Sequence, residues 1–216
     1  NGGVLERAGH TEASIDISKL SKLNPSSVIC EVMNEDGRMA RLDDLVKFSK
    51  KHKIKIASIA DIIAYRLKTE KLVYKIFSKN LDIKRNFYHQ LSIYKNKLND
   101  SESFVISRGN FRKNESVPVR VLSKKIGKNN LFKNTEIKSN LKLLSKYKNF
   151  MLVVINNEAV KKKQSERENT LRYYGIGAQI IKDFKIRNMV LVSRTKKKII
   201  GLEGFGLKIK KQIIIK

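Results

Sequence analysis

Five apolar residues stand together at Met151-Leu152-Val153-Val154-Ile155, and this run predicts a strand that is buried on both faces. Downstream, Leu171–Ile181 leads into a helix, and the apolar run Met189–Val192 predicts another strand. Strand, helix and strand in this order are the repeating unit of an α/β fold. The sequence therefore predicts an α/β (α+β) architecture around this stretch.

Shorter apolar segments on either side predict the remaining elements. In the second part of the chain, Phe104–Ser107 and Val117–Val121 predict strands and Lys198–Leu207 predicts a helix and turn. The Lys- and Asn-rich stretch after residue 72 shows no clear pattern. In the first part, helices and strands alternate. Helices are expected at Thr11–Leu23, Leu42–His52 and Ala60–Leu67, and strands at Val28–Met33 and Ile54–Ile59.

Charge is distributed unevenly along the chain. Residues 1–72 hold 13 Lys and Arg against 10 Asp and Glu, whereas residues 73–216 hold 34 against 10, so most of the net charge of +27 lies in the second part. This shift predicts two domains, 1–72 and 73–216. No apolar run is long enough to cross a bilayer and no signal peptide stands at the visible start, so we expect a cytoplasmic protein without membrane contact. The single Cys excludes an intrachain disulfide.

Reactive side chains gather in the first forty residues. Arg7 and Thr11 can hold a phosphoryl group, and His10 can ligate a metal ion or transfer a proton. Glu31 stands inside an apolar run, where burial would raise the pKa of its carboxyl group. These groups together predict phosphate, metal and proton-transfer chemistry.

Each of these residues also has a plainer interpretation. The segment around His10 could simply begin a helix at the surface. Glu31 could form an ion pair with Arg38 or Arg41, and Cys30 could be a small buried apolar residue. Residue types alone leave both interpretations open.

The order and spacing of these residues resemble the C-terminal half of 3,4-dihydroxy-2-butanone 4-phosphate synthase, which acts on ribulose 5-phosphate in riboflavin biosynthesis. The resemblance runs from Gly2 to Arg66 and includes the segments Arg7–Ala13, Val28–Gly37, Met39–Leu42 and Ile59–Arg66. It implies a catalytic Mg²⁺ or Mn²⁺ ion that stabilises an enediolate while a carboxylate transfers protons, and it implies a homodimer. The site residues that it implies are His10 as metal ligand, Glu31 as acid/base group, and Arg7, Ala8, Gly9, His10, Thr11 and Glu31 as substrate contacts.

In this family an acidic loop and a further histidine precede the segment with which this sequence begins. They supply a second metal ligand and additional catalytic carboxylates. We therefore expect residues 1–72 to hold about half of an active site. Such a fragment should be inactive unless another polypeptide supplies the other half.

The end of the chain, about residues 170–216, is similar to GTP cyclohydrolase II, an enzyme often fused behind the synthase. The similarity is fainter over 85–125. It implies a vestigial nucleotide site, in which Arg172 matches the nucleophilic arginine and Arg120 matches a residue that contacts GTP. Lys198 matches a lysine near the nucleotide, and Ser193 is grouped with these residues.

The same resemblance implies that cyclohydrolase chemistry has been lost. That family needs a zinc ion, held by three cysteines, to activate the attacking water. Lys125, Thr135 and Ile137 stand where the thiolates should be, and Thr170 takes the place of the general-base aspartate. We expect a degenerate second domain that binds no zinc. An active GTP cyclohydrolase II is the less favoured alternative.

A basic nucleic-acid-binding or scaffold protein is the alternative from a different functional class. Lys outnumbers Arg by 35 to 12, and the basic residues do not form a stripe interleaved with aromatic residues, which stacking recognition needs. We therefore expect only non-specific, salt-sensitive association with nucleic acid.

Overall fold

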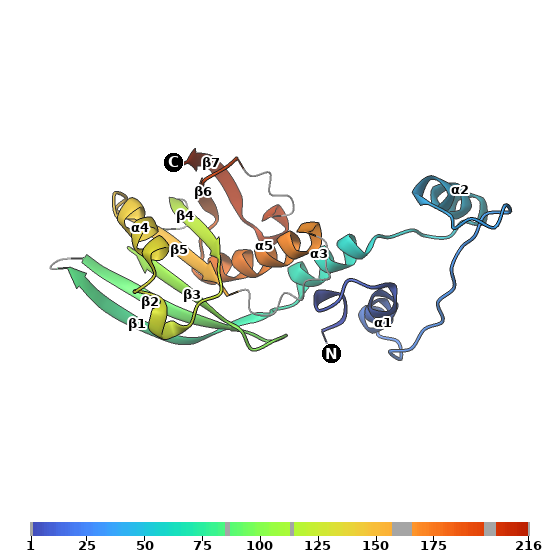
Figure 1. Cartoon of the computed structure of the whole chain (residues 1–216), viewed down its shortest axis with the longest axis horizontal. Coiled ribbons are helices and arrows are strands. Elements are labelled where there is room, and N and C mark those ends of the chain that lie inside the picture. The colour runs from blue at the N-terminus through green and yellow to red at the C-terminus, as the bar shows by residue number, and fades with distance from the viewer. Residues whose placement is uncertain (1, 85–86, 113–114, 157–165, 197–201, 216) are drawn as a thin grey trace. The chain divides into compact units, whose positions relative to one another are not determined.

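The computed structural model describes the chain except for residues 1, 85–86, 113–114, 157–165, 197–201 and 216, and except for the side chains of residues 82–88, 166–172 and 203–204 (Figure 1). The chain divides into two compact units, Asn1–Arg66 and Leu67–Lys216. In the described residues, no helix is long and apolar enough to cross a membrane.

The first unit consists of helices and extended segments. A short 3₁₀ turn at Gly3–Leu5 precedes α1 (His10–Leu20), α2 (Leu42–His52) and α3 (Ile59–Thr69), whose last turn belongs to the second unit. The three predicted helices are therefore confirmed. Helix α2 begins where the carboxylate of Asp44 accepts the backbone N–H of Arg41 at 3.0 Å, and it ends at Lys53, which has a left-handed backbone with φ +54.

The two strands predicted in this unit are wrong. The segments Val28–Met33 and Ile54–Ile59 have no strand structure beyond one isolated bridge, Met33 to Met39. Val28 is 98% exposed. A strand needs a neighbouring strand for its backbone hydrogen bonds and a covering layer for its apolar face. No strand among the described residues pairs with either segment, so the apolar pattern alone does not produce a strand there.

The second unit is built on one mixed seven-stranded sheet with the order β1-β2-β3-β5-β4-β6-β7. β1 to β3 and β5 are joined by antiparallel pairings, whereas β4 runs parallel to β5 and β6, and β6 runs parallel to β7. The strands are β1 (Val73–Lys84), β2 (Phe87–Asn96), β3 (Glu102–Arg108), β4 (Ser116–Ser123), β5 (Phe150–Ile155), β6 (Asn188–Ser193) and β7 (Lys208–Ile214).

Two helices cover opposite faces of this sheet (Figure 1). Helix α4 (Thr135–Leu144) packs through Ile137 against alternate residues of β4 and β5, among them Leu122 and Leu152. Helix α5 (Glu166–Asp183) packs through Ala178 against the other set, which includes Val153. The central strands of the sheet are therefore buried on both faces, as their uninterrupted apolar sequences require.

The predicted strands of this unit are confirmed as β3, β4, β5 and β6, and the predicted helix is confirmed as α5. The segment Lys198–Leu207 contains a 3₁₀ helix at Leu202–Phe205, while its residues 198–201 lie outside the described part. The patterns did not predict β1, β2, α4 or β7.

Candidate functional site

The turn before α1 is held by a buried ion pair. The carboxylate of Asp16, which is 3% exposed, accepts hydrogen bonds from Arg66 Nη1 and from the backbone N–H of Val4, each at 2.8 Å. Arg66 also donates to the carbonyl oxygen of Gly2 at 2.8 Å. Gly3 has φ +58, and a Cβ at this position would overlap the Asp16 carboxylate, so glycine is required. These contacts fix the course of the chain as it enters α1.

The start of α1 collects most of the predicted site residues. Its N-cap, Gly9, has an extended backbone and provides no side-chain hydrogen bond, so the first turn can offer backbone N–H groups to an anion. The exposed Arg7 donates to Glu12 Oε1 at 2.9 Å, and this hydrogen bond holds the pKa of the Glu12 carboxyl below its usual range. The structure brings together the predicted residues Arg7, Ala8, Gly9, His10 and Thr11.

Glu31 lies apart from strands and helices, in the exposed segment that joins α1 to α2. The burial expected for Glu31 is therefore absent. Neither predicted ion pair forms, because Arg38 pairs with Asp36 at 2.6 Å and no ion pair joins Arg41 to Glu31 within the described residues. The expectation for Cys30 is also wrong, since this residue is exposed.

His10 is the predicted ligand for a divalent ion in this region. His10 is exposed at the first position of α1, and Glu12 Oε2 is buried without a hydrogen-bond partner beside Gly9. Across the described ranges, no three His, Cys, Asp or Glu side chains gather into a metal site. Because Mg²⁺ often keeps several waters and uses few protein ligands, His10 fits as one part of a site that needs further oxygen ligands.

The second unit contains a cavity of about 210 Å³ at the carboxyl ends of β4 and β6. The chain leaves β4 through α4 on one face of the sheet, forms β5, and then passes to β6 through α5 on the other face. The carboxyl ends of strands at such a reversal are the usual ligand site of α/β folds. The polar lining comes from β4, α5 and the end of β6, and includes Arg120, Tyr173, Tyr174, Ser193, Arg194 and Thr195.

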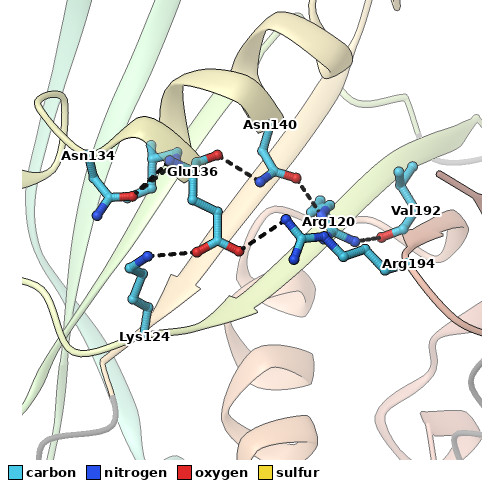
Figure 2. Close-up of polar contacts among 8 residues, drawn as sticks. Arg120, Lys124, Asn134, Glu136, Asn140, Val192 and Arg194 are labelled. Atoms are coloured by element: carbon cyan, nitrogen blue, oxygen red, sulfur yellow. Dashed lines mark hydrogen bonds and ion pairs between the residues drawn. The ribbon is translucent and has the colours of Figure 1, made fainter. Parts of the chain in front are cut away.

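Arg120 is fixed in this cavity by the protein itself (Figure 2). The guanidinium group donates from Nε to Asn140 Oδ1 at 2.5 Å and from Nη1 to the carbonyl oxygen of Val192 at 3.0 Å. Burial lowers the pKa of the Arg120 guanidinium, and the nearby charge of Arg194 lowers it further. Arginine stays protonated in proteins, so these neutral contacts hold a buried positive charge.

Glu136 connects the cations around this cavity (Figure 2). Its carboxylate accepts a hydrogen bond from Lys124 at 2.7 Å and lies 3.7 Å from Arg194. The hydrogen bond from Lys124, followed by the charges of Lys124, Arg194 and Arg120, holds the pKa of the Glu136 carboxyl below its usual range. Asn134 caps the same helical turn by accepting the backbone N–H of Glu136 at 3.1 Å. The network ties the end of β4 to α4 and to the loop after β6.

The predicted vestigial nucleotide site is only partly visible. Arg120 and Ser193 both line the cavity, and the Ser193 hydroxyl donates to the carbonyl oxygen of Thr195 at 2.7 Å. Lys198 lies outside the described residues, as do the side chains of Arg172 and Thr170.

The three positions expected to replace the zinc thiolates are described. Ile137 is fully buried in the core, whereas Lys125 and Thr135 are exposed. None of the three offers a thiolate or imidazole ligand.

Sequence patterns missed the partners that fix these sites. Asp16 and Arg66 are 50 positions apart, and Arg120 and Asn140 come from different elements. One signal was available for Asp16, because it stands between Ile15 and Ile17, and an acidic residue that becomes buried needs a partner.

Comparisons with known proteins divide the chain into two family regions. Residues 1–65 match the family model of 3,4-dihydroxy-2-butanone 4-phosphate synthase, and residues 131–214 match that of GTP cyclohydrolase II.

Several known proteins are similar to nearly the whole of this chain. The chain is 37% identical to the riboflavin biosynthesis protein RibBA of Aquifex aeolicus, over 100% of this chain and 60% of that protein. It is 34% identical to a 3,4-dihydroxy-2-butanone 4-phosphate synthase of Photobacterium phosphoreum, over 97% of this chain and 62% of that protein. The crystal structure of RibBX, a two-domain 3,4-dihydroxy-2-butanone 4-phosphate synthase from A. baumannii, superposes with a TM-score of 0.78 at 31% identity, covering 99% of this chain and 62% of that one. The chain thus spans about three fifths of the relatives it matches.

Proposed function

Since this chain belongs to the RibBA-like family, with a 3,4-dihydroxy-2-butanone 4-phosphate synthase region ahead of a GTP cyclohydrolase II region, we propose that its whole protein works as the synthase of riboflavin biosynthesis. The reaction would convert D-ribulose 5-phosphate to L-3,4-dihydroxybutan-2-one 4-phosphate and formate. We assign residues 1–72 to the synthase domain and 73–216 to the second domain. A homodimer stays a prediction.

The observation that carries this proposal is the exposed start of α1. Arg7 and Thr11 lie on either side of an N-cap that gives no side-chain hydrogen bond, so a phosphate can meet a guanidinium group, a hydroxyl group and backbone N–H groups together. The buried ion pair between Asp16 and Arg66 holds this segment in place. The substrate contacts proposed here are Arg7, Ala8, Gly9, His10, Thr11 and Glu31.

His10 would hold Mg²⁺ or Mn²⁺ as one ligand among others. When bound, such an ion supplies a positive charge beside the sugar oxygens that become negative during the reaction. Glu31 would move protons between carbon and oxygen atoms of the sugar. Since Glu31 is exposed, this role requires the segment between α1 and α2 to pack against further parts of a synthase fold. Its large exposed apolar neighbours, Val28, Ile29 and Met33, support such packing.

The test measures formate release from ribulose 5-phosphate with added Mg²⁺, for the whole protein and for residues 1–216 alone. We expect activity in the whole protein only. Glu31→Gln should lower turnover about 10²–10⁴-fold with little change in substrate binding, the range for a lost general acid/base group. Glu35→Gln, a nearby exposed carboxylate, is the matched control and should leave turnover unchanged. Full activity in Glu31→Gln would reject the role of Glu31.

We further propose that the second domain does not open the purine ring of GTP. The sequence has one cysteine, which lies in the first unit, and a core isoleucine occupies one of the three ligand positions. Zinc analysis of the purified protein tests this directly. Stoichiometric zinc together with formate release from GTP would contradict the proposal.

A further inference from the structure

The second unit has another cavity, which shares no lining residue with the first. Its volume is about 600 Å³, and its lining includes Lys182, Lys185, Arg187, Phe111, Phe205 and Ile186. It lies beside the segments that enter β6 and β7, at the amino ends of these parallel strands. The first cavity lies at the carboxyl ends of β4 and β6, so the two cavities lie at opposite ends of the parallel strands.

Three cations of this second cavity have no acidic partner among the described residues. Lys182, Lys185 and Arg187 are all exposed, and none of them takes part in an ion pair there. Their nearest acidic neighbour in sequence, Asp183, is used elsewhere, because it accepts the Tyr94 hydroxyl at 2.6 Å and lies 3.5 Å from Lys75. Three unpaired cations around one cavity favour an anion of more than one charge.

The backbone around these cations is fixed. The N–H of Lys208, at the start of β7, donates to the carbonyl oxygen of Arg187 at 2.8 Å, and the N–H of Lys185 donates to the carbonyl oxygen of Lys182 at 2.8 Å. Lys185 has a left-handed backbone with φ +61, which ends the turn after α5. The cations therefore extend from an ordered turn, and less entropy is lost when they bind a ligand.

Two aromatic rings complete the lining. Phe111 and Phe205 are both half-buried, so part of each ring remains accessible. Phe111 packs edge-to-face on Phe184, with ring centroids 6.1 Å apart and planes at 73°, which holds its orientation. Accessible rings beside unpaired cations are the combination that recognises a phosphate attached to a planar base.

We propose that this cavity binds a small phosphorylated heteroaromatic molecule of the nucleotide class. Lys182, Lys185 and Arg187 take the phosphate groups, and Phe111 and Phe205 pack against the ring. The volume lies within the usual range for small-molecule sites, about 300–1,000 Å³. The three basic groups come from one short segment, 182–187, that lines a single cavity, which favours a single nucleotide over a polymer. This site is independent of the proposed synthase function.

The experiment titrates the whole chain by calorimetry near physiological ionic strength with three probes: ADP, adenosine and inorganic pyrophosphate. ADP suits this purpose because stacking on aromatic side chains tolerates any base. We expect saturable 1:1 binding of ADP, with adenosine and pyrophosphate each weaker by about tenfold or more. Equal affinity for ADP and pyrophosphate would overturn the role of the rings, and absence of saturable ADP binding would overturn the site.

Variants separate this cavity from general charge attraction. Lys182→Gln with Arg187→Gln should weaken ADP binding at least tenfold. The matched control, Lys138→Gln with Lys142→Gln, removes the same charge from exposed positions of α4 and should leave the affinity unchanged. Equal losses in both variants would mean non-specific attraction and would refute the proposal.

A further variant and a further ligand complete the test. Phe111→Leu should weaken ADP but not pyrophosphate. Tighter binding of a decathymidylate strand than of ADP would show that the ligand is single-stranded nucleic acid and would also refute the proposal.

Discussion

Replacing Asp16 by asparagine should loosen the segment that leads into α1. The substitution keeps the shape of the side chain but removes the negative charge that faces Arg66. Both side chains are buried, Asp16 to 3% and Arg66 to 9% exposure. The guanidinium group would then remain away from water beside the neutral carbonyl oxygen of Gly2, 2.8 Å away. The same carboxylate oxygen also accepts the N–H of Val4, and the uncharged amide oxygen of asparagine would accept both hydrogen bonds more weakly.

The expected magnitude follows from the burial of the pair. Removing one partner of a buried ion pair costs about 3–5 kcal/mol, because the remaining charge stays buried without the carboxylate that faces it. At about 1.4 kcal/mol for each factor of ten, this corresponds to roughly two to four powers of ten in the local opening equilibrium. An exposed pair contributes about 0–1 kcal/mol, so Asp36→Asn, which breaks the exposed pair with Arg38, is the matched control.

Hydrogen exchange is the suitable assay because the two units need not unfold together. The amide of Val4 and those of α1 should lose protection in Asp16→Asn and keep it in Asp36→Asn. Asp16→Leu combined with Arg66→Met should recover part of the loss, since it removes both charges of the pair together. Unchanged protection in Asp16→Asn would refute the claim that this pair holds the segment. If the double variant lost as much amide protection as Asp16→Asn, the hydrogen bond to Val4 would hold the segment, and the charge of the pair would not.

Three further predictions concern the second unit. The pKa of the Glu136 carboxyl is held below its ordinary value of 4.5, chiefly by Lys124, so its contribution to stability is present above pH 4.5 and is lost as pH falls through the lower folded pKa. In Glu136→Gln the free energy of unfolding should therefore fall less steeply at acid pH than in the unchanged protein. The same acid dependence in both would contradict this. Gly175→Ala would place a Cβ 2.7 Å from Leu67 Cδ1 and should destabilise by about 1–3 kcal/mol in urea unfolding, whereas a neutral effect would show that Leu67 moves aside. Asn134→Ala removes the N-cap of α4 and should cost about 1 kcal/mol, while Asn134→Ser should retain most of that stability.

In the second unit, the sequence predicted the strands that have the most fully buried apolar runs. Strand β5 is fully buried along Phe150–Ile155, and β6 has a comparable apolar run, so both patterns were clear. The hairpin β1–β2 was missed because β1 exposes most of its side chains, and its pairing of Val73 with Asn96 depends on contacts distant in sequence. The apolar run Val28–Met33 shows the opposite error. It has the composition of a strand but no partner strand in the described residues.

The same distinction applies to the candidate sites. The proposed phosphate contacts at the start of α1 could be grouped from the sequence because they are adjacent in it. Asn140 was not, because its contact with Arg120 exists only after α4 packs on β4. Candidate ligand contacts can thus be proposed from local motifs, whereas the residues that position them come from tertiary packing.

The two cationic clusters of the second unit differ in how much of their bonding the protein itself satisfies. At the carboxyl ends of β4 and β6, Arg120 already donates to two protein oxygens, and Glu136 already neutralises part of the charge of Lys124 and Arg194. An anion that enters there must compete with an internal carboxylate, which reduces the net gain from binding. At the amino ends of β6 and β7, no carboxylate of the described residues pairs with Lys182 or its two neighbouring cations. Most of the free energy of anion binding by this unit should therefore come from the second cluster, although only the first occupies the customary ligand position of the fold.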